Sequence, residues 1–137
     1  MSSPVASGTE PGEGAPLGVG LDLVDIERFG RVLARRPALN DRLFTSAERA
    51  YAGSLANPVP SLAARFAAKE AVMKALGVGL GAFAFVEVEV GRRPSGEPHL
   101  VLRGRAAELA SERAVGRWLV SLTHTSKAAA AVVLALP

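Results

Sequence analysis

Hydrophobic and polar positions divide the chain into strand-like segments and segments with a helical period. Residues 18–24 near the start and residues 128–136 at the end alternate or run apolar as strands do. Between them, apolar side chains recur every three or four residues over 25–36, 61–76 and 105–114, which predicts amphipathic helices. We therefore expect strands and helices mixed within one fold.

Capping and turn residues predict where the helices begin and end. Asp25 and Ser61 stand at N-cap positions of the first two long helices. Pro37 ends the first of these helices, and Gly77 ends the second. A capping-box spacing, Thr-x-x-Glu, predicts a further short helix over residues 45–52.

The remaining apolar segments predict two hairpins. Residues 85–90 alternate as a half-buried strand, and after turn residues at 94–98 a partner strand follows at 100–102. Residues 118–123 and 128–136 form a closing pair around a short polar turn. Each pair is antiparallel because a tight turn joins its strands.

Composition narrows the class of protein. The chain has 137 residues, 49% of them hydrophobic, which fits one domain with its own core. The absence of cysteine excludes disulfides, thiolate metal sites and a cysteine nucleophile. No signal-peptide pattern opens the chain, and its longest apolar run is far below the roughly 20 residues that span a bilayer. We therefore expect a cytoplasmic protein without a membrane partner.

Charge is distributed unevenly between the start of the chain and the rest. Residues 1–16 are rich in Ser, Gly, Pro and Glu and are expected to be a disordered leader before a domain at 17–137. The formal charge is +3 for the whole chain, and leaving out Glu10 and Glu13 gives 16 basic and 11 acidic residues, or +5, for the domain. A basic domain suits an acidic protein, nucleic acid or a membrane surface.

One acidic residue interrupts the first apolar strand. Asp22 shares its strand face with two glycines, which leave space beside it. Glu70 and Lys74 project from the edge of the apolar face of the helix 61–76, where an unpaired charge is costly. Two carboxylates are the share of ligands that Mg²⁺ often takes from a protein, beside water and substrate phosphate. An ordinary ion pair between Glu70 and Lys74 is the alternative explanation of the helix charges.

A row of arginines follows the helix over residues 25–36. Arg28, Arg31 and Arg35 share one face, and Phe29 belongs to the apolar face. A solvated surface would explain this row, and so would an acidic partner. Nucleic acid is not expected, because the row has no aromatic residues on which bases could stack.

Three segments carry a resemblance to a known family. They read G-V-G-L-D-L-V over residues 18–24, R-F-A-A-K-E-A-V-M-K-A-L-G over 65–77 and S-L-T-H-T over 121–125. Together they resemble the holo-[acyl-carrier-protein] synthase family, the small 4′-phosphopantetheinyl transferases. The resemblance extends from about Leu17 to Leu136. It departs at Val78, where the family has Thr, so a hydroxyl that could contact phosphate is missing here.

This resemblance implies a fold and an activity. The fold is α+β, with helices packed on a small, mainly antiparallel sheet, assembled as a homotrimer with active sites between neighbouring subunits. The activity is the Mg²⁺-dependent transfer of 4′-phosphopantetheine from coenzyme A to a serine of an apo acyl carrier protein, which releases adenosine 3′,5′-bisphosphate. Two alternatives stay open: the same reaction on a polyketide or other secondary-metabolism carrier, and a non-catalytic protein that binds coenzyme A or a carrier.

The resemblance also implies roles for the candidate residues. Asp22 and Glu70 are the expected metal ligands, and Glu70 is also the candidate general base. Lys74 and His124 are expected to serve both catalysis and the binding of coenzyme A, although His124 could instead be structural. The other expected contacts with coenzyme A are Lys69, Gly77 and Gly79. The acidic helix of the carrier is expected at Arg28, and Arg31, Arg35 and Arg42 are further candidate contacts.

Overall fold

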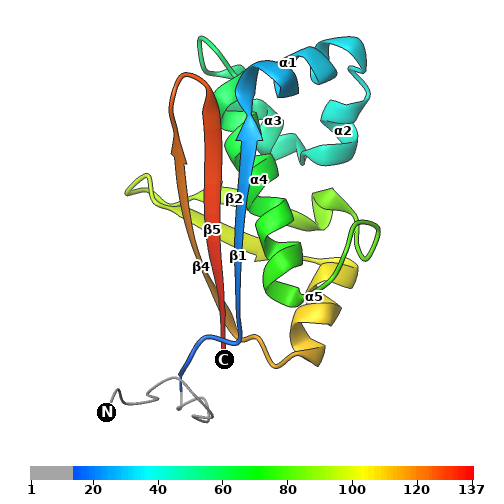
Figure 1. Cartoon of the computed structure of the whole chain (residues 1–137), viewed down its shortest axis with the longest axis vertical. Helices are drawn as coiled ribbons and strands as arrows, with labels where there is room; N and C mark the ends of the chain where they lie inside the picture. Colours follow the sequence, from blue (N-terminus) through cyan, green and yellow to red (C-terminus); the bar gives the residue numbers. More distant parts are fainter. Residues whose placement is uncertain (1–13) are drawn as a thin grey trace, which may run out of the picture.

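The computed structural model describes residues 14–137 and shows a sheet with helices on one face (Figure 1). The sheet has three antiparallel strands in the order β1-β5-β4. Their bounds are Gly18–Asp25 for β1, Arg117–His124 for β4 and Ala128–Leu136 for β5. The predicted leader, residues 1–16, lies outside the described residues except for its last three positions.

The long helix α4 (Val59–Leu76) runs along the inner face of this sheet (Figure 1). Gly18 and Gly20 of β1 face the helix so closely that a Cβ at these positions would lie 2.0 and 1.8 Å from carbonyl oxygens of α4. Only glycine fits such an approach of strand and helix. The approach also places Asp22, the next residue on that face of β1, beside α4.

Helix α4 is buried on several sides, whereas the sequence predicted one apolar face. Small side chains allow β1, β5 and the second sheet to approach the helix from different directions. Its fully buried apolar residues are Ala63, Ala67, Ala68, Ala71 and Val72. The helix therefore forms the centre of the core.

The other elements surround α4. Three short helices gather near its first turns and a fifth helix lies near its last turns, while a two-stranded sheet crosses beside it (Figure 1). Their bounds are α1 Ile26–Arg35, α2 Leu39–Leu43, α3 Ser46–Gly53, η1 Phe85–Glu87 (a 3₁₀ helix), β2 Val88–Arg92, β3 Pro98–Leu102 and α5 Gly104–Glu112. Four phenylalanine rings form a chain of contacts in the order Phe44, Phe29, Phe66 and Phe85.

Two predicted helix starts are confirmed. The Asp25 carboxylate accepts a hydrogen bond of 2.8 Å from the backbone N–H of Arg28, so it caps α1. Thr45 and Glu48 form the complete capping box of α3, each side chain accepting from the other's backbone N–H. These contacts are local, which is why the sequence predicts them well.

Two other predicted boundaries were wrong. Helix α4 begins at Val59 rather than after Ser61, because proline is tolerated in a first turn. The Ser61 hydroxyl accepts instead from the guanidinium of Arg65, at 2.7 Å. The predicted strand 85–90 begins only at Val88, since a 3₁₀ turn precedes it.

The outer face of the three-stranded sheet is apolar and exposed. Its large side chains come from all three strands, and Leu21 and Leu23 are 63% and 70% exposed. The set is Val19, Leu21, Leu23, Leu119 and Val132. We call this set the outer sheet face. Over residues 14–137, no helix has both the length and the apolar character needed to cross a membrane.

Candidate active site

The structure brings Asp22, Glu70 and Lys74 together where β1 meets α4. The Lys74 ammonium donates to the Asp22 carboxylate at 3.0 Å and to the backbone oxygen of Leu21 at 2.9 Å. The carboxyl groups of Asp22 and Glu70 are close enough to share a hydrogen bond. The cation of Lys74 therefore pairs with Asp22 across two elements, and not with Glu70 one turn away on the same helix.

The electrostatics of this cluster are those of two crowded carboxyls. The pKa of Glu70 is raised to about 7, first by burial, then by the negative charge of Asp22 and by their hydrogen bond, while Lys74 acts in the opposite direction. At neutral pH, Glu70 is therefore poised between its two protonation states. A group with such a pKa can accept and release a proton under working conditions.

The cluster also fits a hard divalent cation. Carboxylate oxygens are the ligands that Mg²⁺ prefers, and a cation between two carboxyls would remove their mutual repulsion. Within residues 14–137 no group of three or more His, Cys, Asp or Glu side chains could hold a metal ion. An ion at Asp22 and Glu70 would thus complete its coordination with water and substrate oxygens.

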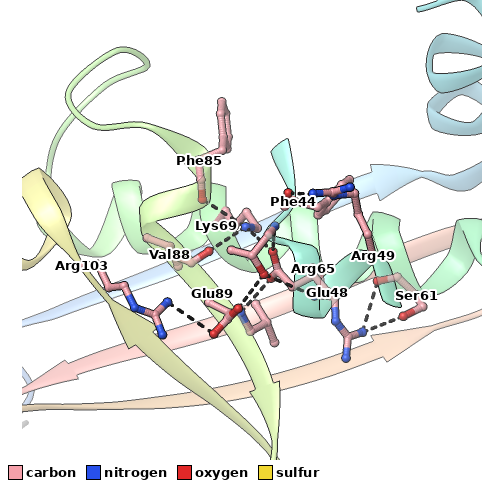
Figure 2. Close-up of polar contacts among 12 residues, drawn as sticks. Phe44, Glu48, Arg49, Ser61, Arg65, Lys69, Phe85, Val88, Glu89 and Arg103 are labelled. Carbon is pink, nitrogen blue, oxygen red and sulfur yellow. Dashed lines mark hydrogen bonds and ion pairs between the residues drawn. The ribbon is translucent and has the colours of Figure 1, made fainter. Parts of the chain in front are cut away.

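The prediction that Lys69 contacts a phosphate of coenzyme A was wrong. Its side chain is 0% exposed, and its ammonium donates to Glu48 at 2.8 Å and to the backbone oxygens of Phe85 and Val88 at 3.0 and 2.6 Å (Figure 2). Burial lowers the pKa of Lys69, and Glu48 counteracts that effect. With three acceptors and no exposed surface, this ammonium has no donor left for a ligand.

The partner of Lys69 joins three elements. Besides the ammonium, the Glu48 carboxylate accepts from the backbone N–H groups of Thr45 and Val90, at 2.9 and 2.8 Å. The contacts link α3, α4 and β2 (Figure 2). The buried pair thereby fixes α4 about its axis, and with it the direction in which Glu70 projects.

A groove of about 530 Å³ opens beside Glu70. Arg28 and Asp25 lie in its lining together with Glu70, and the remaining lining is apolar. Its apolar residues include Phe29, Leu33, Leu43, Phe66, Leu80 and Phe85. Of the predicted arginine row, Arg28 alone lines this groove, while Arg31 pairs with Glu27 at 2.7 Å on the exposed side of α1.

His124 lies in a different cavity. This second cavity, of about 600 Å³, is lined by residues of α3, α4, β4 and the hairpin between β2 and β3. It contains His124 and Ser121 but neither Asp22 nor Glu70. Within one chain, the structure therefore does not bring His124 to the acidic pair.

Of the two glycines after α4, Gly77 has a conformational explanation. Gly77 has a φ of 68°, the left-handed conformation that ends many helices, and its N–H bonds back to the carbonyl of Lys74. The carbonyl of Gly79 accepts from Ala82 at 3.2 Å within the following turn. Gly77 and Lys74 line one surface hollow, and Gly79 lies outside it.

Sequence reasoning missed three residues of the second cavity: Tyr51, Arg65 and Arg92. Arg65 is 5% exposed, and both arginines lie against the ring of Tyr51. The spacing of Ser61 and Arg65, one helical turn apart, was the available signal for their contact. The approach of Tyr51 and Arg92 depends on the tertiary fold.

The chain belongs to the 4′-phosphopantetheinyl transferase superfamily, whose family model matches residues 18–133. Its relatives define it further as an enzyme of the holo-[acyl-carrier-protein] synthase type. The synthase of Moorella thermoacetica is 49% identical over 118 residues, covering 86% of this chain and 92% of its own. That of Salinispora arenicola is 49% identical over 117 residues, covering 85% and 95%.

Solved structures agree with this assignment. The crystal structure of the Neisseria meningitidis synthase matches with a TM-score of 0.80 and 30% identity, covering 88% of this chain and 98% of that one. The Helicobacter pylori synthase, solved in complex with coenzyme A, matches with a TM-score of 0.75 and 26% identity, covering 87% and 99%. The predicted family, the α+β fold and the enzyme class are confirmed.

Proposed function

We propose that this protein transfers 4′-phosphopantetheine from coenzyme A to a serine of an apo acyl carrier protein and releases adenosine 3′,5′-bisphosphate. The observation that carries the proposal is the cluster of Asp22, Glu70 and Lys74 at the groove that Arg28 also lines. The names of the relatives support the reaction, and the coenzyme A in the H. pylori complex supports the donor.

The reaction needs a base and stabilisation of negative charge. The serine oxygen attacks the phosphorus that bears pantetheine, the bond from that phosphorus to the bridging oxygen breaks, and the bridging oxygen leaves with adenosine 3′,5′-bisphosphate. Glu70 accepts the serine proton, directly or through a water, and its pKa of about 7 suits this role. Lys74, which is 56% exposed while bound to Asp22, donates to phosphate oxygens.

Asp22 and Glu70 are the residues that would hold Mg²⁺. The bound ion supplies positive charge that polarises the diphosphate and stabilises the leaving phosphate. Asp22 has a second task, because its hydrogen bond positions the Lys74 ammonium.

The separation of the two cavities supports a site shared between subunits of a homotrimer. Coenzyme A has a nucleotide end and a diphosphate. The cavity that contains His124 would bind the nucleotide end, and the diphosphate would lie at Glu70. The outer sheet face offers the apolar surface for assembly, because monomeric proteins rarely expose a contiguous patch of this kind. In such a trimer, His124 of one subunit serves the acidic pair of the next.

The acidic helix of the carrier docks on α1. Arg28 is the central contact because it lines the groove that leads to Glu70. Arg35 adds positive charge, and Arg31 contributes less because Glu27 already neutralises it. Opposite charges on the two surfaces steer the carrier serine toward the acidic pair.

Mass spectrometry tests the proposed function. The protein is incubated with coenzyme A, Mg²⁺ and several apo carriers, from both fatty-acid and polyketide synthesis. We expect a mass increase of one phosphopantetheine group on at least one carrier, and the relative rates identify the preferred carrier. No increase on any carrier would contradict the proposal and favour a non-catalytic binder.

A further inference from the structure

The buried ammonium of Lys69 binds the short 3₁₀ helix η1 as well as the Glu48 carboxylate. It donates to the backbone oxygens of Phe85 and Val88, the first residue of η1 and the residue that follows it, at 3.0 and 2.6 Å (Figure 2). Hydrogen bonds from a charged donor are stronger than those between neutral groups. One side chain of α4 therefore ties both ends of η1 to the long helix.

The helix η1 supplies one wall of the groove beside Glu70. The ring of Phe85 stacks on the ring of Phe66 with their centres 5.4 Å apart, and both rings line the groove. Phe66 and Glu70 are one turn apart on α4, so both project from the same side of that helix. The distance between α4 and η1 therefore sets the width of the groove where Glu70 lies.

The chain on either side of η1 does not fix it against α4. The preceding segment 77–84 contains three glycines, and beyond their chain neighbours no atom lies within 4 Å of where their Cβ atoms would stand. At the other end of η1, the Glu87 carboxylate accepts from the backbone N–H of Arg105 at 2.9 Å, a contact that leads to α5. Among the residues that the structure describes, Lys69 alone donates hydrogen bonds from α4 to the segment 85–88.

The buried pair of Lys69 and Glu48 is suited to fixing geometry rather than to adding stability. Both side chains are 0% exposed, and the cost of removing two charges from water offsets much of their attraction. Apolar side chains of similar volume often give equal or better stability in such a place. An ammonium differs from them because it can hold three acceptors in fixed positions, and here these belong to α3, η1 and β2.

We propose that Lys69 is a positioning residue for the carrier, which holds Phe85 at the distance from Glu70 that the carrier needs when its serine reaches the acidic pair. The inference rests on the proposed function for the identity of the molecule in the groove. The ammonium has no donor left for a substrate, so it acts through the position of η1. Release of η1 changes the groove and weakens carrier binding, while the contact of β1 with α4 still holds the acidic pair.

Steady-state kinetics of the double variant Lys69→Met, Glu48→Gln tests this role, because the variant leaves no buried charge unpaired. We expect the KM for the apo carrier to rise about tenfold, while the kcat falls less than about threefold and the KM for coenzyme A changes less than about twofold. Phe85→Ala removes the wall itself and should raise the carrier KM similarly, and adding it to the double variant should change little. Val133→Ala, in the core on β5 and outside the groove lining, is the control for a general loss of stability and should leave the carrier KM unchanged.

Two kinetic outcomes would overturn the inference and leave the proposed function standing. The first is a carrier KM of the double variant within about twofold of the wild-type value. The second is a further rise of the carrier KM, in proportion, when Phe85→Ala is added to the double variant, because independent effects add.

Hydrogen exchange followed by NMR decides the role of Lys69 even if the protein modifies no carrier. The backbone N–H of Val88 bonds to the carbonyl of Phe85, so its exchange reports on the opening of η1. In the wild type it should exchange about as slowly as the N–H of Ala68 at the centre of α4, and at least about tenfold faster in the double variant. If the double variant does not fold, the wild-type rate decides alone. An equal rate in both proteins, or a wild-type rate as fast as that of Ala82 in the turn before η1, would overturn the inference.

Discussion

Asp22 and Glu70 lie side by side although one belongs to β1 and the other to α4, and their carboxyl groups are close enough to share a hydrogen bond. Their meeting depends on Gly18 and Gly20, which allow the strand to touch the helix backbone. The position of the acidic pair therefore depends on the close contact between β1 and α4. Glycine occupies every second position before Asp22 because that face of the strand touches the helix.

The first prediction concerns the sharing of active sites between subunits. Asp22→Asn and His124→Ala should each abolish most of the transfer activity. If subunits of both variants are mixed at random in trimers, about one site in four combines an intact acidic pair with an intact His124 from the neighbour. We therefore expect a mixture that has been unfolded and refolded together to recover about a quarter of wild-type activity. Activity no higher than the mean of the two variants would show that each site lies within one chain.

The second prediction concerns stability and pH. The pKa of Glu70 is about 7 in the folded protein, above its ordinary value of 4.5, so ionisation of Glu70 destabilises the fold as the pH rises between these values. Glu70→Gln should consequently raise the stability at pH 8, by about 1 kcal/mol after allowance for solvent screening, and change it little at pH 4. Thermal unfolding without divalent cations, with Glu112→Gln on the surface of α5 as control, measures this. A gain of equal size at both pH values would contradict the shifted pKa.

The third prediction concerns the buried pair. Lys69→Met leaves the Glu48 carboxylate buried without its cation, which typically costs about 3–5 kcal/mol. Lys69→Met combined with Glu48→Gln should recover a large part of that loss, because no charge is then left unpaired. Urea unfolding of both variants, beside the exposed control Lys127→Met, measures the difference. If the single and double variants are equally stable, the unpaired Glu48 charge is not the source of the loss.

Features that depend on contacts close in the sequence were predicted, and features that depend on distant contacts were not. Asp25 and Thr45 were recognised as caps because their partners lie three residues away. Lys69 was assigned to a phosphate because its partner, Glu48, lies on another helix and no helical spacing connects them. The convergence of Asp22 and Glu70 came from a family resemblance, since periodicity alone does not place a strand residue beside a particular helix residue.

The same reasoning explains what was missed in the second cavity. Tyr51 and Arg92 come from α3 and from the end of β2, and only the packing of both elements against α4 brings them to Arg65. An arginine in an alanine-rich helix was visible in the sequence. Its burial, and the donor that it leaves unsatisfied, are properties of the fold.

The fourth prediction concerns the docking of the carrier. Arg28→Ala should raise the KM for the carrier about fivefold at low salt, because it removes positive charge beside the groove that leads to Glu70. The effect should shrink as salt rises, while the KM for coenzyme A stays constant. Arg117→Ala, at the start of β4, is the control for a general loss of charge. A carrier KM that is unchanged at low salt would remove α1 from the docking surface.

The most direct test of the central claim is the binding of one divalent cation by Asp22 and Glu70 together. Mn²⁺, which electron paramagnetic resonance detects, can replace Mg²⁺ in a titration of the wild-type protein, Asp22→Asn and Glu70→Gln, with coenzyme A present and transfer activity measured in parallel. We predict one bound ion per chain in the wild type, and at least a tenfold loss of affinity and of activity in each variant. Wild-type affinity for Mn²⁺ in both variants would contradict the claim that these two carboxylates hold the ion.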